Sequence, residues 1–289
     1  MIKWLILIGV LVFICIVEWI REIVTFKVTH YDIRSDKLKE LEHERKVVFL
    51  SDLHNNRYGK NNEKLLSAIK EQNPDLILIG GDMLVGKSNV SSKVAENFVS
   101  KLTEICPIYY ANGNHEQRMK VYSEYGTMFQ EYKDILESSG VIFIENECVD
   151  VNWDKCQVKI YGLEIPVGYY KKFKKQTLPV DVVEEQIGEP KTDCYNILLA
   201  HNPTYGDTYL EWGADLELAG HFHGGVVRIP KLGGIITPQW HVFPKYSGEM
   251  TQRNGKSIIV SKGLGTHTIR VRFLNPAEVV VLHIGGNDS

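Results

Sequence analysis

The sequence predicts an α/β fold that follows an N-terminal membrane helix. Short apolar runs of strand length alternate with longer amphipathic stretches, and several of these runs end in polar residues, which together favour the α/β class. The helix is predicted by an apolar run at residues 4–20 that only Glu18 interrupts. At 289 residues the chain can bury a large core without disulfide staples.

The N-terminal apolar run is the first element. No small-residue cleavage site follows it, and Trp19 lies where an interfacial aromatic residue belongs. We therefore expect residues 1–22 to form an uncleaved single-pass membrane anchor and residues 23–289 to form one domain. A cleaved signal peptide and a buried core helix are the alternatives. Lys3 before the run and Arg21 after it do not decide the orientation, and we expect the domain on the outer face.

Strands and helices then alternate along the domain. Residues 24–33 alternate roughly between polar and apolar side chains, which is typical of a strand. Eight apolar runs predict further strands at residues 46–50, 76–79, 108–111, 141–144, 196–200, 216–219, 257–260 and 279–283. Amphipathic stretches predict helices at residues 62–72, 90–105, 123–138 and 180–186. Residues 224–248 are rich in Gly and Pro and predict a long loop over a functional site.

Charge and cysteine content narrow the function classes. A formal net charge of -3 argues against nucleic acid as a partner, because nucleic-acid binding needs a clustered excess of Lys and Arg. The five cysteines are scattered and odd in number, so no disulfide framework is expected. Cys148 and Cys156 could meet across a hairpin, but we expect both to be reduced. The lysine-rich run at residues 171–175 is expected to be a solvated face.

Five predicted strands are followed by residues of metal-ligand types rather than by ordinary turn residues. These residues are Asp52 with His54, Asp82, Asn114 with His115, His201, and His221 with His223. In an α/β sheet, side chains just beyond the carboxyl ends of the strands converge even when they are far apart in sequence. The sequence therefore predicts a metal site built from these clusters.

The spacing inside the clusters supports a shared site. Residues two apart on an extended chain point the same way, so Asp52 and His54 can share a metal ion, and His221 and His223 are expected to obey the same rule at the same site. Glycines before several of these residues would let the backbone turn sharply and approach the ions closely. A single histidine is more often a surface or core residue than a ligand, and we interpret the others in this way: His30, His43, His241, His267 and His283.

These motifs, in this order, resemble the calcineurin-like metallophosphoesterase family. The resemblance covers roughly residues 46–283 and rests on Asp52-Leu53-His54, Gly81-Asp82, Gly113-Asn114-His115-Glu116, His201 and Gly220-His221-Phe222-His223. Within the family the chain is similar to a membrane-associated bacterial branch, on the anchor, on Arg228-Ile229-Pro230 and on Ser261-Lys262-Gly263-Leu264-Gly265. The resemblance implies a sandwich of two mixed β-sheets flanked by helices, with residues 23–289 as the catalytic domain.

The resemblance also implies roles for the clustered residues. One ion would be held by Asp52, His54 and His223, the other by Asn114, His201 and His221, and Asp82 would bridge the two. His115 would act on the substrate as the catalytic residue, Glu116 could orient His115, and Arg228 could contact the substrate. The ligands suit two divalent ions of Mn, Fe, Co or Zn, because no cysteine joins the cluster.

The expected reaction is metal-dependent hydrolysis of a phosphate ester, either a monoester or a diester, by in-line attack of water on phosphorus. The anchor makes a lipid or cell-envelope phosphate the expected substrate. In the predicted loop, apolar residues could contact an acyl chain or could pack the loop down, and these are Ile235, Ile236, Trp240, Phe243 and Tyr246. A two-metal hydrolase of another bond and a non-catalytic metal- or phosphate-binding module are the alternatives.

Overall fold

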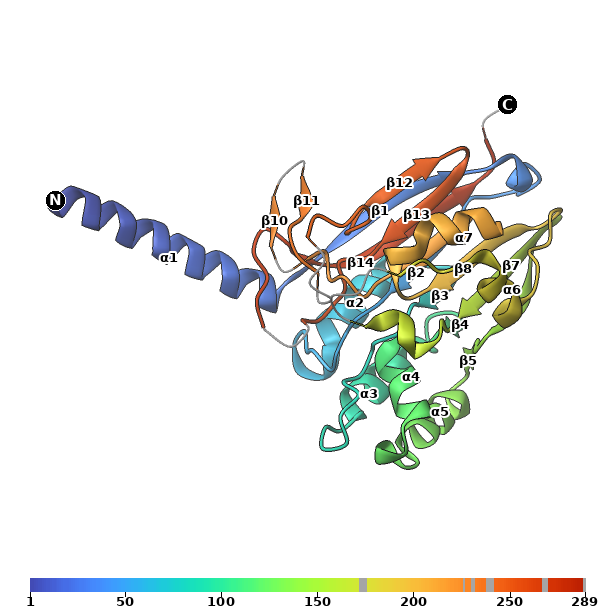
Figure 1. The fold of residues 1–289 in the computed structure, drawn as a ribbon, viewed down its shortest axis with the longest axis horizontal. Coiled ribbons are helices and arrows are strands. Elements are labelled where there is room, and N and C mark those ends of the chain that lie inside the picture. The colour runs from blue at the N-terminus through green and yellow to red at the C-terminus, as the bar shows by residue number, and fades with distance from the viewer. Residues whose placement is uncertain (172–175, 226, 230–231, 238–241, 267–269, 288–289) are drawn as a thin grey trace.

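The computed structural model describes residues 1–171, 176–225, 227–229, 232–237, 242–266 and 270–287, and it shows two mixed β-sheets with helices on their outer faces (Figure 1). The first sheet has the order β1-β14-β2-β3-β4-β5, with only the β14–β2 pair antiparallel. Its strands are β1 (Phe26–Arg34), β2 (Arg45–Leu50), β3 (Leu76–Ile79), β4 (Ile108–Tyr110), β5 (Val141–Phe143) and β14 (Ala277–Gly285). The expected fold class is confirmed.

The second sheet has the order β12-β13-β9-β8-β7-β6, with parallel strands in the centre and an antiparallel strand at each edge. Its strands are β6 (Glu147–Trp153), β7 (Cys156–Leu163), β8 (Tyr195–Ala200), β9 (Leu216–Ala219), β12 (Met250–Arg253) and β13 (Lys256–Val260). The β6–β7 hairpin pairs Cys148 with Tyr161 and Cys156 with Trp153, so the two cysteines are not opposite each other, and both are free.

The period of two along β2 shows how the sheets pack. Val47 and Phe49 contribute to the core between the sheets, where they join Ile197 and Leu199 of β8. Val48 and Leu50 lie on the other face and pack under the outer helices. Because both faces of such a strand are buried, its sequence is a continuous apolar run rather than an alternating one.

Helices cover the outer face of each sheet. On the first sheet these are α2 (Glu63–Glu71), α3 (Lys93–Leu102) and α5 (Met128–Ser138), and on the second they are α6 (Val180–Ile187) and α7 (Gly206–Trp212). The helix α4 (Asn114–Val121) begins at one of the predicted ligands. Short 3-10 turns occur at η1 (Asp36–Leu38), η2 (Lys60–Asn62), η3 (Ser123–Tyr125), η4 (Val167–Tyr170) and η5 (Pro203–Tyr205).

The helix predicted at residues 123–138 is divided in two. Gly126 has a φ of +55°, a left-handed conformation that ends the turn η3 before α5 begins. The helices α4 and α7 and the hairpin β6–β7 were not predicted, because α4 contains the polar motif of residues 114–116 and the other segments mix polar with apolar residues. The predicted loop at 224–248 contains only a small two-stranded sheet of β10 (Arg228–Ile229) and β11 (Gly233–Gly234) among its described residues.

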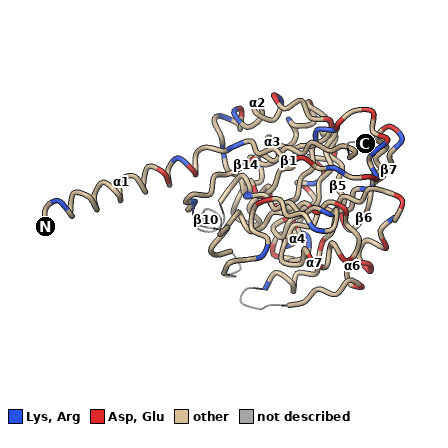
Figure 2. Tube along the Cα trace, turned by 90° about the horizontal axis from the view of Figure 1, so that it is seen from above, with Lys and Arg blue, Asp and Glu red and all other residues tan. Residues whose placement is uncertain are grey.

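Helix α1 (Ile2–Val24) projects away from the sandwich (Figure 1). Of the helices in the described part of the chain, α1 alone is both long enough and apolar enough to cross a membrane. None of its most apolar 18-residue window is buried in the protein. Figure 2 shows charged residues near its two ends with an uncharged stretch between them. Its last turns touch the domain, where Trp19 Nε1 donates a 2.9 Å hydrogen bond to the carbonyl oxygen of Arg270.

Candidate metal centre

The carboxyl ends of five strands meet at one edge of the sandwich, and the side chains that follow them form the site. The structure brings together three overlapping groups, within each of which the ligand atoms lie within 4.8 Å of one another. These groups are Asp52 with His54 and His223, His54 with Asp82 and His115, and Asp82 with His201 and His221. All seven side chains are buried. Convergence of the strand ends therefore places the predicted residues in one cluster.

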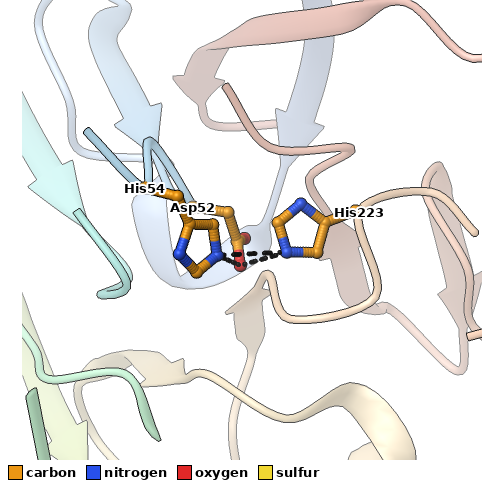
Figure 3. A group of neighbouring side chains, drawn as sticks. All are labelled: Asp52, His54 and His223. Atoms are coloured by element: carbon orange, nitrogen blue, oxygen red, sulfur yellow. Dashed lines mark hydrogen bonds and ion pairs between the residues drawn. The ribbon is translucent and has the colours of Figure 1, made fainter. Parts of the chain in front are cut away.

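The first group is compact (Figure 3). His223 Nε2 lies 3.3 Å from Asp52 Oδ1, and His54 Nε2 lies 3.8 Å from the same oxygen. The two histidine Nε2 atoms are 3.2 Å apart. Ligand atoms that bind one ion at about 2.0–2.2 Å lie roughly 3–3.5 Å apart, so these three side chains could hold a single metal ion.

Asp82 connects the group of Asp52, His54 and His223 to the group of His201 and His221. Its Oδ2 lies 3.7 Å from His54 Nε2 and 3.2 Å from His201 Nε2. Its Oδ1 faces away and accepts a 2.8 Å hydrogen bond from the backbone N–H of His115. One carboxylate oxygen is thus shared between the two groups, while the other is used to hold the side chain in place.

Hydrogen bonds also orient the other ligand candidates. Asp52 Oδ2 accepts a hydrogen bond from Ser51 Oγ at 2.5 Å, and the backbone N–H of His221 donates to Oδ2 at 3.0 Å and to Oδ1 at 3.1 Å, while Oδ1 also faces the histidine rings. His201 Nδ1 lies 2.6 Å from the Gly80 carbonyl oxygen, and His223 Nδ1 lies 3.2 Å from that of Gly265. Because a carbonyl accepts the Nδ1 proton, the Nε2 lone pair of each ring points into the cluster, as a metal ligand requires.

The prediction that Asp52 and His54 align on extended backbone is wrong. Both have left-handed backbone, with φ of +55° and +47°, and His221 and His223 have φ of +64° and +50°. Tight turns therefore present these side chains, and such φ values are uncommon for residues other than glycine. The residues between them, Leu53 and Phe222, are buried as expected, at 0% and 1% exposure.

Close approach between loops requires glycine at two of the predicted positions. A Cβ atom on Gly220 would lie 1.9 Å from Ser51 Oγ and 2.2 Å from Asp52 Oδ2. A Cβ atom on Gly81, which has a φ of +86°, would lie 2.0 Å from the backbone nitrogen of Gly113. The glycines thus allow the loops that bear the candidate ligands to pack against each other.

Glu116 supports the loop that carries Asp82. Its carboxylate accepts hydrogen bonds from the backbone N–H groups of Asp82 at 2.8 Å, Met83 at 3.0 Å and Gly113 at 3.1 Å. The Tyr110 hydroxyl donates a further one at 2.7 Å. Burial raises the pKa of Glu116 to about 7, and the Asp82 carboxylate adds to the rise. These contacts hold the Asp82 loop rather than the ring of His115.

The His115 ring is oriented by a backbone group. The N–H of Gly86 donates a 2.8 Å hydrogen bond to His115 Nδ1, so in the neutral ring the proton lies on Nε2. This Nε2 lies 3.9 Å from Asp82 Oδ2. His115 also lines the pocket above the cluster, so it contacts both the candidate ligands and the pocket.

The electrostatics of the cluster match a site that accommodates positive charge. Burial alone would raise the pKa of Asp52, but His223 and His201 hold it well below its usual range. Burial also opposes charge on His201, yet Asp82 and Asp52 raise its pKa to about 10. His221 behaves in the opposite way, since burial and then the neighbouring His201 lower its pKa well below the ordinary value.

A pocket of about 1090 Å³ opens over the cluster. Its lining includes four residues of the predicted set, which are His54, Asn114, His115 and His221. It also includes cations that the sequence analysis did not select, and these are Arg57, Lys87, Arg118, Lys171 and Arg270. They come from loops and one helix with no common motif, so only the fold gathers them. Lys171 begins the run that we expected to be a solvated face, and residues 172–175 lie outside the described part of the chain.

Arg228 is placed away from this pocket. Its guanidinium donates to the carbonyl oxygens of Gly224 at 2.7 Å and Ser247 at 3.1 Å, and it pairs with Glu249. Among the described residues that line the pocket, Arg228 does not occur. Its contacts hold the two ends of the 224–248 loop together. Of the remaining histidines, His30 on β1 and His283 on β14 have Nδ1 and Nε2 3.0 Å apart, while His241 and His267 lie outside the described residues.

Asn275 supports the loop of His223 and was not predicted. Its Nδ2 donates a 2.7 Å hydrogen bond to the His223 carbonyl oxygen and another to that of Gly225. Its backbone N–H donates to Glu22 Oε2 at 2.8 Å, so the same residue also contacts the end of α1. No local pattern marks this residue, because its partners lie 50 residues or more away in sequence.

Comparison with known proteins places the chain in a family. Residues 45–225 match the family model described as calcineurin-like phosphoesterase, and this range contains every predicted ligand. The chain belongs to the calcineurin-like phosphoesterase family. It is accordingly a hydrolase that acts on phosphoester bonds, and the buried His and Asp clusters suit a dinuclear divalent metal site of this family.

Individual relatives in this family are bacterial. The chain is 27% identical over 234 residues to the uncharacterized metallophosphoesterase YkoQ of Bacillus subtilis (strain 168), covering 81% of each chain. It is 27% identical over 228 residues to the phosphodiesterase YaeI of Escherichia coli (strain K12), covering 76% of this chain and 75% of that protein. A solved structure, the phosphopantetheinyl hydrolase PptH from Mycobacterium tuberculosis, shares 12% identity with a TM-score of 0.48, over 78% of this chain and 92% of that one.

Proposed function

We propose that Asp52, His54 and His223 hold one divalent ion, that Asn114, His201 and His221 hold a second, and that Asp82 bridges them. The shared position of Asp82 Oδ2, 3.7 Å from His54 Nε2 and 3.2 Å from His201 Nε2, carries this assignment. Mn, Fe, Zn and Co are the candidate ions, because the donors are carboxylate, amide and imidazole groups.

Asn114 and His221, proposed ligands of the second ion, have lone pairs that fit a cation. The amide oxygen of Asn114 faces only acceptors, with His221 Nδ1 2.8 Å away, while its nitrogen faces only donors. Among the described residues, the buried Nε2 atom of His221 makes no hydrogen bond. In this orientation the two lone pairs fit a cation beside them; with the amide flipped, the Asn114 nitrogen would instead donate to His221 Nδ1.

His115 is proposed as the catalytic residue. When bound, the two ions would orient the phosphoryl group and lower the pKa of a water molecule that attacks phosphorus in line. The Gly86 N–H at Nδ1 leaves the His115 proton on Nε2, and the residue lines the pocket. This proton can pass to the leaving oxygen, or stabilise the charge that develops on it.

The reaction is tested with the full-length protein in detergent, loaded with Mn and offered bis-p-nitrophenyl phosphate and p-nitrophenyl phosphate. Turnover of either one supports hydrolysis at phosphorus, and their ratio assigns diester or monoester preference. The variant Asp82→Asn should lose both ions by elemental analysis, and Asp150→Asn, an exposed carboxylate on the β6 strand, should keep them. Metal retention without turnover of either ester would favour a metal- or phosphate-binding module.

We propose further that residues 1–22 anchor the catalytic domain 23–289 to a membrane. Retention of α1 is supported by its contacts with the domain: Trp19 donates to the Arg270 carbonyl, and Glu22, only 1% exposed, accepts from the N–H of Asn275. Cleavage after residue 22 would remove both contacts. Carbonate extraction of membranes, followed by mass determination of the mature chain, tests both retention and cleavage.

A lipid-linked or cell-envelope phosphate ester is the proposed substrate. The pocket lining is rich in Arg and Lys, which suits an anionic head group, and its member Arg270 contacts α1 through Trp19. The pocket therefore lies beside the membrane helix. Hydrolysis of long-chain lipid phosphates should exceed that of short-chain analogues in mixed micelles, whereas equal rates would remove support for a lipid substrate.

The outer face of the membrane is the proposed location of the domain, because cell-envelope phosphate esters occur there. Exposed Cys148 on β6 offers a readout, since the cysteines of the domain are free. A membrane-impermeant maleimide should label Cys148 in intact cells if the domain lies outside. Labelling only after cell lysis would place it in the cytoplasm.

A further inference from the structure

A group of large apolar side chains outside α1 is exposed on the domain. We define the apolar patch as Ile229, Leu232, Val242, Phe243 and Leu274, which are 38%, 66%, 61%, 56% and 46% exposed. Isolated exposed apolar residues are ordinary, but a cluster of them marks a contact surface. Phe243 and Leu274 also have left-handed backbone, with φ of +47° and +52°, which is unusual for bulky residues.

Backbone hydrogen bonds join the patch residues into one unit. The N–H of Arg228 donates to the Phe273 carbonyl at 3.1 Å, which joins β10 to the segment that contains Leu274. Leu232 donates to Ile229 at 3.0 Å, and Phe243 donates to Ile235 at 2.9 Å. Ile235 in turn donates to Val227, which forms a bridge with Phe273. The five side chains are therefore carried by segments that are bonded to one another.

The same unit rests on the end of α1. Leu274 precedes Asn275, whose N–H donates to Glu22 Oε2 at 2.8 Å. Figures 1 and 2 both show β10 on the side of the domain from which α1 leaves. Exposed cations lie on either side of this junction, Lys27 just after α1 and Arg270 in the loop before Leu274. Apolar side chains with nearby cations next to a membrane helix match an interface with anionic lipid head groups.

We propose that the apolar patch enters the head-group region of the same bilayer that α1 spans, so that the domain contacts the membrane at a second place. The occupant of the patch is the lipid bilayer. This inference rests on the proposed membrane anchor. With α1 as its one contact, the domain could rotate about the helix axis. A second contact at the apolar patch fixes the tilt of the domain and holds the Arg270 side of the pocket at the lipid surface.

The test uses full-length protein in nanodiscs of phosphatidylcholine and phosphatidylglycerol that contain brominated lipid, in a Cys15→Ser, Cys148→Ser background. An environment-sensitive fluorophore is attached to one of three introduced cysteines: Ile8→Cys in α1, Phe243→Cys in the patch, or Ile135→Cys on α5. Ile135 is 46% exposed and lies on a helix away from α1, so it is the matched control (Figure 1). We expect lipid quenching at positions 8 and 243 and none at position 135.

The outcomes separate this inference from the anchor. Quenching at position 8, with position 243 as unquenched as position 135, would overturn the second contact and leave the anchor intact. No quenching at position 8 would overturn both. A blue-shifted but unquenched fluorophore at position 243 would show that protein, such as a second copy of the chain, covers the patch instead of lipid, and would also overturn the inference.

A functional variant gives an independent readout. The double variant Leu232→Asp, Phe243→Asp changes only exposed side chains, so its melting temperature and its turnover of soluble bis-p-nitrophenyl phosphate should match the parent. Turnover of a phosphate ester embedded in anionic vesicles should fall by roughly tenfold, because loss of two apolar contacts weakens interfacial binding by at least that factor. Equal losses on both substrates would point to a folding defect and count against membrane contact.

Discussion

The side-chain amide of Asn275 donates a 2.7 Å hydrogen bond to the carbonyl oxygen of His223. His223 and the two glycines after it have positive φ, so their carbonyls cannot use regular secondary structure as a partner. Asn275 is fully buried and supplies partners for two of these carbonyls. It therefore acts as a positioning residue for a proposed metal ligand.

Replacing this amide should loosen the first metal group. We expect Asn275→Ala to lower the free energy of unfolding by about 1–3 kcal/mol, since two buried carbonyls lose their donor. Metal affinity should fall by roughly 10- to 100-fold, as for other residues that orient ligands. Asn196→Ala is the matched control, because Asn196 is also buried and donates to a backbone carbonyl, that of Lys191, at the opposite end of β8. Calorimetric titration with Mn should show weaker binding for Asn275→Ala alone.

His115→Ala should slow turnover without emptying the site. Loss of the proposed proton donor should reduce kcat by about 10²- to 10⁴-fold, the range typical of general acid catalysis. Elemental analysis should still find close to two ions per chain. The cluster of His115 with His54 and Asp82 offers a competing role as ligand, and a drop in metal content would establish that role instead.

Removal of the ions should destabilise the folded domain. Ions that bind only the folded state stabilise it by about 2.7 kcal/mol at a concentration 100 times Kd, so a chelator should lower Tm by several degrees and Mn should restore it. Differential scanning fluorimetry with EDTA and with Mn measures the shift. The Tm of Asp82→Asn should change little with either reagent. If its Tm shifts as much as that of the parent protein, Asp82 is not a metal ligand.

Glu217 predicts a dependence of stability on pH. This β9 residue is fully buried, and neither carboxylate oxygen has a hydrogen-bond partner among the described residues. Burial, and then Asp207, raise the pKa of Glu217 well above its ordinary value. The folded state therefore holds a proton that the unfolded state releases at lower pH, and stability falls as pH rises above the unfolded pKa, by up to about 1.4 kcal/mol per pH unit.

Glu217→Gln removes that proton equilibrium while keeping the shape of the side chain. We expect the variant and the parent to have equal stability near pH 4 and the variant to be more stable at pH 8. Urea unfolding at both pH values provides the comparison. If the stability difference between variant and parent is the same at pH 4 and pH 8, Glu217 does not titrate in this range. Glu211→Gln, at an exposed position, is the control and should match the stability of the parent at both pH values.

The sequence was sufficient to predict the central strands and the seven candidate ligands, for a shared physical reason. Strands buried on both faces are continuous apolar runs. Polar residues directly after them mark the edge of the sheet where the carboxyl ends of parallel strands lie. The apolar runs at residues 46–50 and 216–219 therefore predicted two strands, and the polar residues that follow these runs predicted Asp52 and His221 as ligands. The order of these motifs also identified the family.

The parts that the sequence did not predict depend on long-range contacts. The left-handed backbone of Asp52 and His54 is imposed by packing between loops. The backbone of Asp52 bonds to Gly81 and Gly265, and the N–H of His54 donates to the Asp82 carbonyl. The pocket cations and Asn275 share no spacing with the ligands, so no local pattern marks them. Glu217 lies within an apolar strand, so the sequence pattern gives no sign that its side chain matters. The β6–β7 hairpin has too many polar residues to be predicted as a buried strand, because one of its faces meets solvent.

The pairing of the two ends of the chain constrains how the molecule is made. Strand β1, which directly follows α1, is parallel to β14, and β14 lies between β1 and β2. The first sheet is incomplete until the last residues have been synthesised. With α1 as the proposed membrane anchor, and because α1 and β1 precede β14 in the chain, the sheet would close with β1 already tethered. Biogenesis would thus place the final folding step at the membrane surface, and loss of the C-terminal strand would leave a tethered but unfolded chain.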